Sequence, residues 1–435
     1  MALAGYRSEL LSVPVDPRDS GMEAVVHYSD GLIVVEDGLI VAVGDFHETV
    51  ARFPELEVRH YPGKLITPGF VDTHIHYPQT DRIAAYGHQL LEWLEKHIFP
   101  VEARFANLEY ARETAGFFLD ELLRNGTTSA LVFATVHEGS VDALFEAADA
   151  RGMRIVSGKV LMDLGPETLN DRGGHGRAET EAQIARWRGR GRLGYAVTPR
   201  FALTSSEVQL TMAGELLARH PDVLFHTHLA ENHAEIEAVA QRFPDCPDYL
   251  AVYERYGLVG SRSIFAHCIH LEDGALERMA ASGAGAALCP TSNLFLGSGL
   301  FDLARLDAAG VRVGFGTDVG AGTSFSMLAT LAEAYKVCQL RGSALDPFRA
   351  LHLATAGGAA ILGLGHCIGA LEPGMEADFL VLDPAATPLL GRRTAGQGLA
   401  DRLFALQILG DDRSIHATYV AGRTVHERSA CLTHN

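Results

Sequence analysis

The chain has 435 residues, of which 47% are hydrophobic and 21% are charged. These values are ordinary for a globular protein, and the length suits two or three domains or one large α/β barrel with an appendage. With 36 basic against 54 acidic residues the formal charge is −18, which argues against a general nucleic-acid or anionic-membrane surface.

The cysteines and the N-terminal stretch both indicate a cytoplasmic protein. The first segment, "MALAGYRSELLSVPVDPRDSG", contains no long apolar run, and no later run approaches the length of a membrane span. No Cys-x-x-Cys pair occurs, so we expect reduced thiols rather than a disulfide framework. The cysteines are Cys246, Cys268, Cys289, Cys338, Cys367 and Cys431.

Both ends of the chain are typical of short β-strands. In residues 1–66, "AVVHYSDGLIVVEDGLIVAVG" places two Asp-Gly pairs between β-rich runs, which is the strongest short-range hairpin signal. Residues 371–435 repeat the pattern in "GALEPGMEADFLVLD" and "IHATYVAGRTVHE". Because neither end has enough apolar residues to fold alone, we expect the two ends to form one small β-sandwich domain together.

Residues 67–370 alternate apolar runs with helical stretches such as 206–220 and 272–282. Eight strand candidates, most of them followed by a helix, predict a closed parallel (β/α)8 barrel. An open doubly wound sheet would need a glycine-rich phosphate loop, and neither common motif occurs. The eight runs are 69–76, 127–136, 153–163, 194–201, 223–231, 263–270, 284–290 and 311–318.

Histidines and an aspartate stand at the expected carboxyl ends of these strands, where barrels carry their chemistry. His74 and His76 are two residues apart on one strand and so share a face. The fifth, sixth and eighth strands add His228, His267 and Asp318. Imidazoles with one carboxylate suit Zn²⁺ or Fe²⁺, and a bound metal makes water nucleophilic at neutral pH.

Three neighbouring residues bear on this site. His226 shares a face with His228, but His228 lies nearer the strand end, so His226 is expected one layer deeper as a supporting or core group. Glu231 follows three residues after His228 and can carry protons, although a glutamate is also favoured in the first turn of a helix. Lys159 lies well before the end of its strand, which favours one metal over a lysine-bridged pair.

Two sets of motifs carry a family resemblance over nearly the whole chain. "PGFVDTHIH", "THLAE", "AHC" and "GTD" occur in that order at strand ends and resemble the amidohydrolase superfamily. "HIHYPQTD", "LLEWLEKHIFPVEARF", "TPRFALTSS" and "LCPTSNLFLGSG" are similar to segments of its guanine deaminase family.

The resemblance implies zinc-dependent deamination of guanine to xanthine and ammonia by a metal-bound hydroxide, in a homodimer. It implies that His267 orients the water, Asp318 takes its proton, and Glu231 delivers protons to the purine and to ammonia. It implies one zinc ion, with Fe²⁺ as the alternative. The implied metal ligands are His74, His76, His228 and Asp318. The implied substrate-binding residues are His76, Gln79, Arg200, Phe201, His228, Glu231 and Asp318.

The residue types at the implied purine site make chemical sense. Arg200 can donate to a purine oxo group and Phe201 can stack on the ring. Trp93 is expected to pack beneath the pocket wall.

Other functions compete with this interpretation. A neighbouring aminohydrolase would act on 8-oxoguanine, a triazine or an adenosine-type nucleoside. A non-catalytic scaffold would lack metal ligands, and here they are present. The deaminase class with a His/Cys/Cys zinc site is excluded because its P-C-x-x-C signature is absent.

Overall fold

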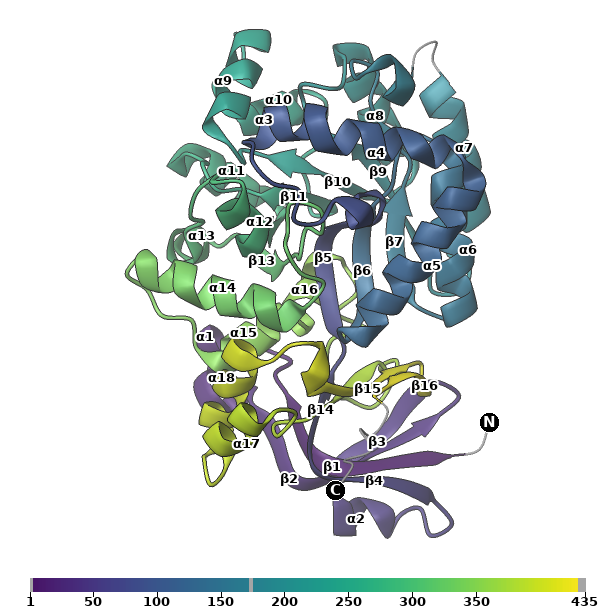
Figure 1. Cartoon of the computed structure of the whole chain (residues 1–435), viewed down its shortest axis with the longest axis vertical. Coiled ribbons are helices and arrows are strands. Elements are labelled where there is room, and N and C mark those ends of the chain that lie inside the picture. The colour runs from purple at the N-terminus through teal and green to yellow at the C-terminus, as the bar shows by residue number, and fades with distance from the viewer. Residues whose placement is uncertain (1–2, 172–174, 429–435) are drawn as a thin grey trace.

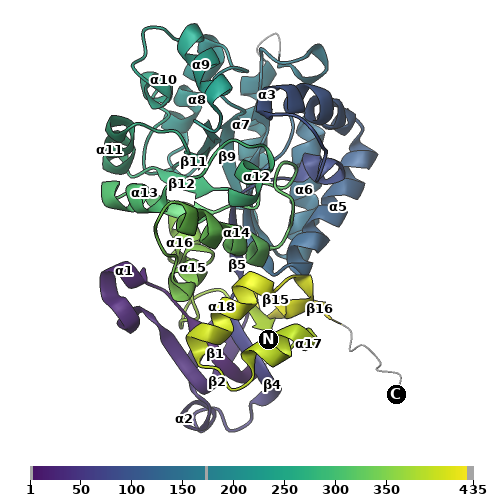
Figure 2. The same ribbon diagram turned by 60° about the vertical axis from the view of Figure 1, so that its left-hand side comes forward.

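The computed structural model describes residues 3–171 and 175–428. Parallel strands form a nearly closed barrel, and strands from both ends of the chain form a second sheet beside it (Figures 1 and 2). The predicted fold class is therefore confirmed. No helix in the described ranges is long and apolar enough to span a membrane. Five cysteines are free thiols, and Cys431 lies outside the described residues.

The barrel strands follow one another in chain order, each beside the strand before it. Every pair between them is parallel, as predicted from the eight runs. The third run is split, because the short strand β8 (Val160–Leu161) continues it and pairs with β9. The barrel strands are β5 (Phe70–His76), β6 (Thr127–Phe133), β7 (Arg154–Gly158), β9 (Gly194–Pro199), β10 (Leu224–Leu229), β11 (Ser263–His267), β12 (Gly285–Leu288) and β13 (Arg312–Phe315).

The barrel closes where β13 meets β5. Thr73 Oγ1 donates to the carbonyl oxygen of Phe315 at 2.9 Å, and the backbone N–H of Asp318 donates to the carbonyl oxygen of His74 at 2.9 Å. Gly316 permits this approach, because a Cβ there would lie 2.8 Å from the same His74 oxygen. Closure therefore places Asp318 directly beside His74.

Helices surround the strands and begin and end where the sequence has capping residues. The predicted helix at 206–220 is α8 (Glu207–Arg219), and its N-cap Ser206 accepts from the N–H of Gln209 at 3.1 Å. The predicted helix at 272–282 is α11 (Asp273–Ser282), whose C-cap Gly283 has the left-handed conformation. The other barrel helices of seven or more residues are α5 (Leu108–Arg124), α6 (Glu138–Arg151), α7 (His175–Trp187), α9 (His233–Arg242), α10 (Tyr249–Arg255), α13 (Leu303–Ala309), α14 (Met327–Leu340) and α15 (Pro347–Leu353).

A short helical stretch lies at the barrel end remote from the second sheet (Figure 1). It runs through α3 (Leu90–Trp93), a π-helical turn η3 (Leu94–Ile98) and α4 (Phe99–Glu102). π-Helical turns are rare and occur often at functional sites. The stretch is the "LLEWLEKHIFPVE" segment of the sequence, so a family-like motif covers the carboxyl ends of the strands.

The small domain is one mixed sheet built from both ends of the chain. Its order is β16-β15-β14-β4-β1-β2-β3. Asp37 and Gly38, with φ of 51° and 82°, form the predicted turn between β2 and β3. The other Asp-Gly pair is not a turn, because residues 30–31 lie inside β2, where the β1 register shifts. The strands are β1 (Ala4–Ser12), β2 (Val26–Glu36), β3 (Leu39–Asp45), β4 (Glu57–Pro68), β14 (Phe379–Leu382), β15 (Ile415–Val420) and β16 (Arg423–Glu427).

This sheet curls over its own core. Tyr6 on β1 and Tyr419 on β15 are separated by two strands, yet their ring centroids are 4.9 Å apart. Strands in a flat sheet are about 4.8 Å apart, so rings three strands away would lie about 14 Å apart. The curl encloses an aromatic core that also contains Phe379.

An ion cluster joins the small domain to the bottom of the barrel. Arg192, which precedes β9, pairs with Glu376 and with Asp378 at 2.6 Å, and both carboxylates precede β14. Arg154 at the start of β7 also pairs with Glu376. These contacts join residues on either side of the predicted boundary at 370/371, and the exact boundaries stay a prediction.

We expect Glu376→Gln to lower the free energy of unfolding by roughly 3 kcal/mol near neutral pH, because two largely buried arginines lose a carboxylate partner. Burial raises the pKa of Glu376, but the hydrogen bonds and charges of Arg154 and Arg192 outweigh it and hold the pKa below its usual value. Such a group stabilises the fold above its unfolded pKa and loses this effect as the pH falls through the folded pKa.

Chemical denaturation should therefore show that the difference between the unmodified protein and Glu376→Gln narrows below about pH 4. The exposed Glu55→Gln, in the same small domain, is the matched control and should change stability little. An unchanged difference across this pH range would contradict the stabilising role of the carboxylate.

Candidate active site and metal centre

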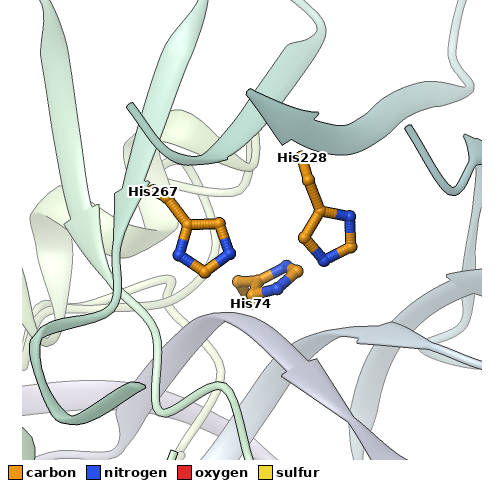
Figure 3. A group of neighbouring side chains, drawn as sticks. All are labelled: His74, His228 and His267. Carbon is orange, nitrogen blue, oxygen red and sulfur yellow. The ribbon is translucent and has the colours of Figure 1, made fainter. Parts of the chain in front are cut away.

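The predicted histidines meet at the carboxyl end of the barrel. Figure 3 shows the rings of His74, His228 and His267 turned toward one another from β5, β10 and β11. One ligand atom from each lies within 4.8 Å of the others, so the three side chains are a candidate metal site. Asp318 follows β13 and is brought to the same place by the closure of the barrel.

Distances between donor atoms match a first coordination shell. His74 Nε2 lies 3.2 Å from Asp318 Oδ1, and His76 Nε2 lies 3.4 Å from the same oxygen. His76 Nε2 is also 3.2 Å from His228 Nε2. Zinc binds nitrogen and oxygen at about 2.0–2.1 Å, so ligands of a tetrahedral site are about 3.3 Å apart. These three distances are compatible with binding of one divalent cation.

Hydrogen bonds to the Nδ1 atoms of His228 and His74 leave their Nε2 atoms facing the candidate metal position. His228 Nδ1 is 2.7 Å from the carbonyl oxygen of Arg200, so Nδ1 carries the proton and Nε2 is free to bind a metal. His74 Nδ1 lies 2.8 Å from His226 Nε2, which confirms the deeper supporting place predicted for His226. Nε2 of His74 is buried and makes no hydrogen bond to the described residues. Such a buried nitrogen is suited to bind a metal ion.

Two groups of three side chains have ligand atoms within 4.8 Å of one another, and neither group contains the whole predicted ligand set. One group is His74, His228 and His267, and the other is His74, Cys289 and Asp318. His76 is in neither group, although its Nε2 is close to His228 and Asp318. The assignment of His76 as a ligand and of His267 as a water-orienting group therefore stays a prediction.

Burial controls the electrostatics of the site. It lowers the pKa of His74, His76 and His228 well below the usual value, so these imidazoles are neutral and keep their lone pairs. Burial also raises the pKa of Asp318 to about 6 and that of Glu231 to about 8, where the charge of Asp318 contributes. A cation at this point would favour the charged form of both carboxyl groups.

Backbone strain is concentrated at the same edge. His267, Cys268 and Asp318 have positive φ values of 73°, 54° and 51°, and Ala230 beside Glu231 has 51°. Non-glycine residues seldom adopt this conformation, and it costs of the order of 1 kcal/mol each. The fold thus holds these side chains in place against local preference, as is common in active sites.

A pocket with an empty volume of about 390 Å³ opens onto these groups. Every residue predicted for the site lines this pocket except His74. Trp93, predicted beneath the wall, is itself part of the wall, and its indole Nε1–H donates to the carbonyl oxygen of Ala85 at 3.0 Å. The predicted residues in the wall are His76, Gln79, Arg200, Phe201, His228, Glu231, His267 and Asp318, and the apolar ones are Leu90, Trp93, Leu94, Leu296 and Ala321.

Sequence reasoning missed three buried carboxyl groups around the site. Asp72 accepts from the N–H groups of His74 at 3.2 Å and Thr317 at 3.1 Å, and so ties β5 to the Asp318 loop. Its place two residues before His74 was the available signal. Glu235 accepts from the N–H of Glu231 at 3.0 Å, and Glu102 contacts Gln79 and Arg200. The last contact joins distant segments and left no sequence signal.

Lys159 is ion-paired away from the histidines. Its ammonium group contacts Asp171, with Glu179 at 3.3 Å. Its ammonium group is therefore held in an ion cluster with these two carboxylates, and the expectation of a single metal stays a prediction.

The chain belongs to the amidohydrolase family, whose model matches residues 65–425. The chain is 51% identical to guanine deaminase of Escherichia coli (strain K12) over 418 residues, which is 95% of each chain. A solved structure of E. coli guanine deaminase superposes with a TM-score of 0.96 at 50% identity, covering 98% of this chain and 100% of the other.

A further solved structure is guanine deaminase from C. acetobutylicum with guanine bound in its active site. It has a TM-score of 0.90 at 29% identity and covers 98% of this chain and 100% of that one. An adenosine deaminase from Xanthomonas campestris with bound zinc has a TM-score of 0.83 at 25% identity, covering 97% and 92%. The fold is thus shared by deaminases of more than one substrate.

Two alanine variants separate the candidate ligands. We expect His76→Ala to bind well below one metal per chain, because a ligand is lost, whereas His267→Ala keeps about one metal per chain and loses turnover. Metal analysis of the purified variants, with deaminase activity measured in parallel, is the test. Metal retained in His76→Ala but lost in His267→Ala would make His267 the third imidazole ligand.

Proposed function

We propose that this chain hydrolyses guanine to xanthine and ammonia with one zinc ion per chain, for which Fe²⁺ is the alternative. Its activity is that of a guanine deaminase, a hydrolase. The observation that carries this is 51% identity to E. coli guanine deaminase over 95% of each chain. The histidine cluster, which is suited to a metal, agrees with that activity.

His74, His76, His228 and Asp318 would hold the metal. Three of their mutual distances support this set, and so does the buried Nε2 of His74, which makes no hydrogen bond to the described residues. A bound divalent metal supplies Lewis-acid chemistry, which makes water nucleophilic at neutral pH. Zinc, bound in the related adenosine deaminase structure, is the metal we propose.

Glu231, Asp318 and His267 would move and hold the protons. Glu231 Oε2 lies 3.3 Å from His267 Nε2, and Ser298 donates to its Oε1 at 3.2 Å. His267 Nδ1 lies 2.9 Å from the side-chain oxygen of Asn293, so Nε2 is its accepting nitrogen and can orient the attacking water. Asp318 accepts the proton of that water. Glu231 delivers its proton to the purine ring, takes up the proton of the new hydroxyl group as the carbonyl forms, and passes that proton to the leaving ammonia. The proton held by Asp318 then returns to Glu231, which restores both carboxyl groups.

Arg200, Phe201 and Gln79 would hold the purine. All three line the pocket beside the proposed ligands His76 and His228. The Arg200 guanidinium has only donors, so it binds the oxo group of guanine, and the Phe201 ring stacks on the base. Hydrolysis then occurs at the ring carbon that bears the amino group.

The competing functions have less support than guanine deamination. Deaminases and hydrolases of adenosine or triazines share the fold, yet at 20–25% identity they are far less similar than guanine deaminases. A non-catalytic scaffold is disfavoured by the intact cluster of donors. The homodimer and the cytoplasmic location stay predictions.

Glu231→Gln tests the proton carrier. The amide keeps the size and the hydrogen bond from Ser298 but cannot exchange a proton, so kcat should fall by about 10²–10⁴-fold with bound metal unchanged. The exposed Glu237→Gln, on the helix α9 that follows Glu231, is the control and should keep full turnover. Near-normal turnover of Glu231→Gln would remove Glu231 from the mechanism.

Arg200→Ala tests the choice of substrate. The purine six position is an oxo acceptor in guanine and an amino donor in adenine, and a site built for one rejects the other by roughly 10⁴–10⁵. We expect the unmodified protein to leave adenine essentially unreacted, and Arg200→Ala to lose this preference through loss of guanine turnover. Phe201→Ala should weaken both purines more evenly. Competitive adenine turnover by the unmodified protein would contradict the proposal.

A further inference from the structure

A single buried carboxylate lies behind the proposed purine site and contacts two of its residues. Glu102 is the last residue of α4 and is 1% exposed. Its Oε2 accepts from Arg200 Nη1 at 2.6 Å, and its Oε1 accepts from Gln79 Nε2 at 3.2 Å. Arg200 and Gln79 line the pocket, whereas Glu102 does not.

The contact with Glu102 fixes which way the Gln79 amide faces. A carboxylate paired with arginine only accepts hydrogen bonds, so the NH₂ group of Gln79 must point at Glu102. The amide oxygen then points the other way, beside Gly320, where an added Cβ would stand 2.0 Å from it. Among the described residues no group donates to this oxygen, so it is an acceptor available to a ligand.

The same carboxylate orients and neutralises Arg200. Glu102 is the only carboxylate that pairs with Arg200 among the described residues, and Phe99, on the same helix, has its ring centroid 5.3 Å from the guanidinium carbon. The guanidinium uses one N–H for Glu102, and its other N–H groups have no acceptor in the described part of the chain. Arg200 therefore offers donors to the pocket.

We infer that Glu102 is a positioning residue that sets the hydrogen-bond pattern of the purine site, with donors from Arg200 next to the acceptor oxygen of Gln79. This role rests on the proposed function, and it makes Glu102 the group that determines which edge of the purine the site accepts. A donor beside an acceptor is complementary to an oxo group beside a ring N–H, which is the edge at positions 6 and 1 of guanine. A 6-aminopurine presents the reverse pattern.

Replacement of Glu102 should weaken the preference for guanine rather than the hydrolysis step itself. With glutamine at this position, Arg200 is a buried cation without its ion-pair partner. The new amide can also donate to Gln79 and reverse that side chain. The metal ligands and Glu231 are not touched by Glu102 in the described structure.

The test compares guanine with 2,6-diaminopurine, which keeps the 2-amino group but has an amino group at position 6 and no N–H at position 1. In Glu102→Gln we expect kcat/KM for guanine to fall about 10- to 100-fold, mainly through KM, with bound metal unchanged. The slow turnover of 2,6-diaminopurine should change less than about threefold, so the preference for guanine falls at least tenfold.

Two further variants make the result decisive. Gln79→Met removes the amide oxygen but leaves the Glu102–Arg200 pair, so it should also lower the preference for guanine even if Glu102→Gln folds poorly. Asp378→Asn, which removes a buried carboxylate paired with Arg192 outside the site, should keep the preference.

An equal loss for both substrates in Glu102→Gln, or a full guanine preference in Gln79→Met, would overturn the inference. Failure of the proposed purine site itself has a different signature, because Arg200→Ala would then keep guanine turnover. If Arg200→Ala loses guanine turnover while Glu102→Gln keeps the preference for guanine over 2,6-diaminopurine, only the role of Glu102 is rejected.

Discussion

The burial of ionisable side chains at the carboxyl end of the barrel is the constraint on which the site depends. Desolvation keeps His74, His76 and His228 neutral, so their lone pairs are free, and it raises the pKa of the nearby carboxyl groups of Asp318 and Glu231. Such a cluster is costly in an apolar interior unless a cation accepts those lone pairs and balances the carboxylates. The same burial thus gives the candidate metal site neutral imidazoles and carboxyl groups whose charge a cation would balance.

The fold supplies the rigidity that this arrangement requires. Barrel closure between β5 and β13 places Asp318 beside His74, and Asp72 ties the two segments together through Thr317. Strained backbone at His267 and Asp318 persists because strands and hydrogen bonds on both sides hold it. Around this frame, α3 brings Trp93 to the pocket wall, and α4 brings Glu102 into contact with Arg200 behind that wall.

Local patterns in the sequence predict most of the fold. Apolar runs give all eight barrel strands, Ser206 marks the start of α8, and the Asp37-Gly38 turn is where the hairpin signal places it. The Asp-Gly pair at residues 30–31 was wrongly predicted to be a turn, because strand β2 continues there through a register shift. That shift depends on pairing with the partner strand β1. Turn propensity alone cannot distinguish a turn from an irregularity within a strand.

The site is predictable in part for the same reason. His74, His228, His267 and Asp318 stand at strand ends, so barrel geometry alone brings them together. Glu102 lies 98 residues from Arg200 in the chain, and no periodicity links the two. Trp93 was misplaced because a helical segment over a barrel mouth has no register with the strands. Contacts between loops that cover a barrel are set by tertiary packing and are seen only in the structure.

X-ray absorption spectroscopy of the metal in the purified enzyme tests the central claim most directly, because the structure offers both a histidine-rich donor group and one that contains Cys289. We expect nitrogen and oxygen neighbours only, at about 2.0–2.1 Å, with several imidazoles among them. A sulfur neighbour at about 2.3 Å, or fewer than two imidazoles, would contradict it.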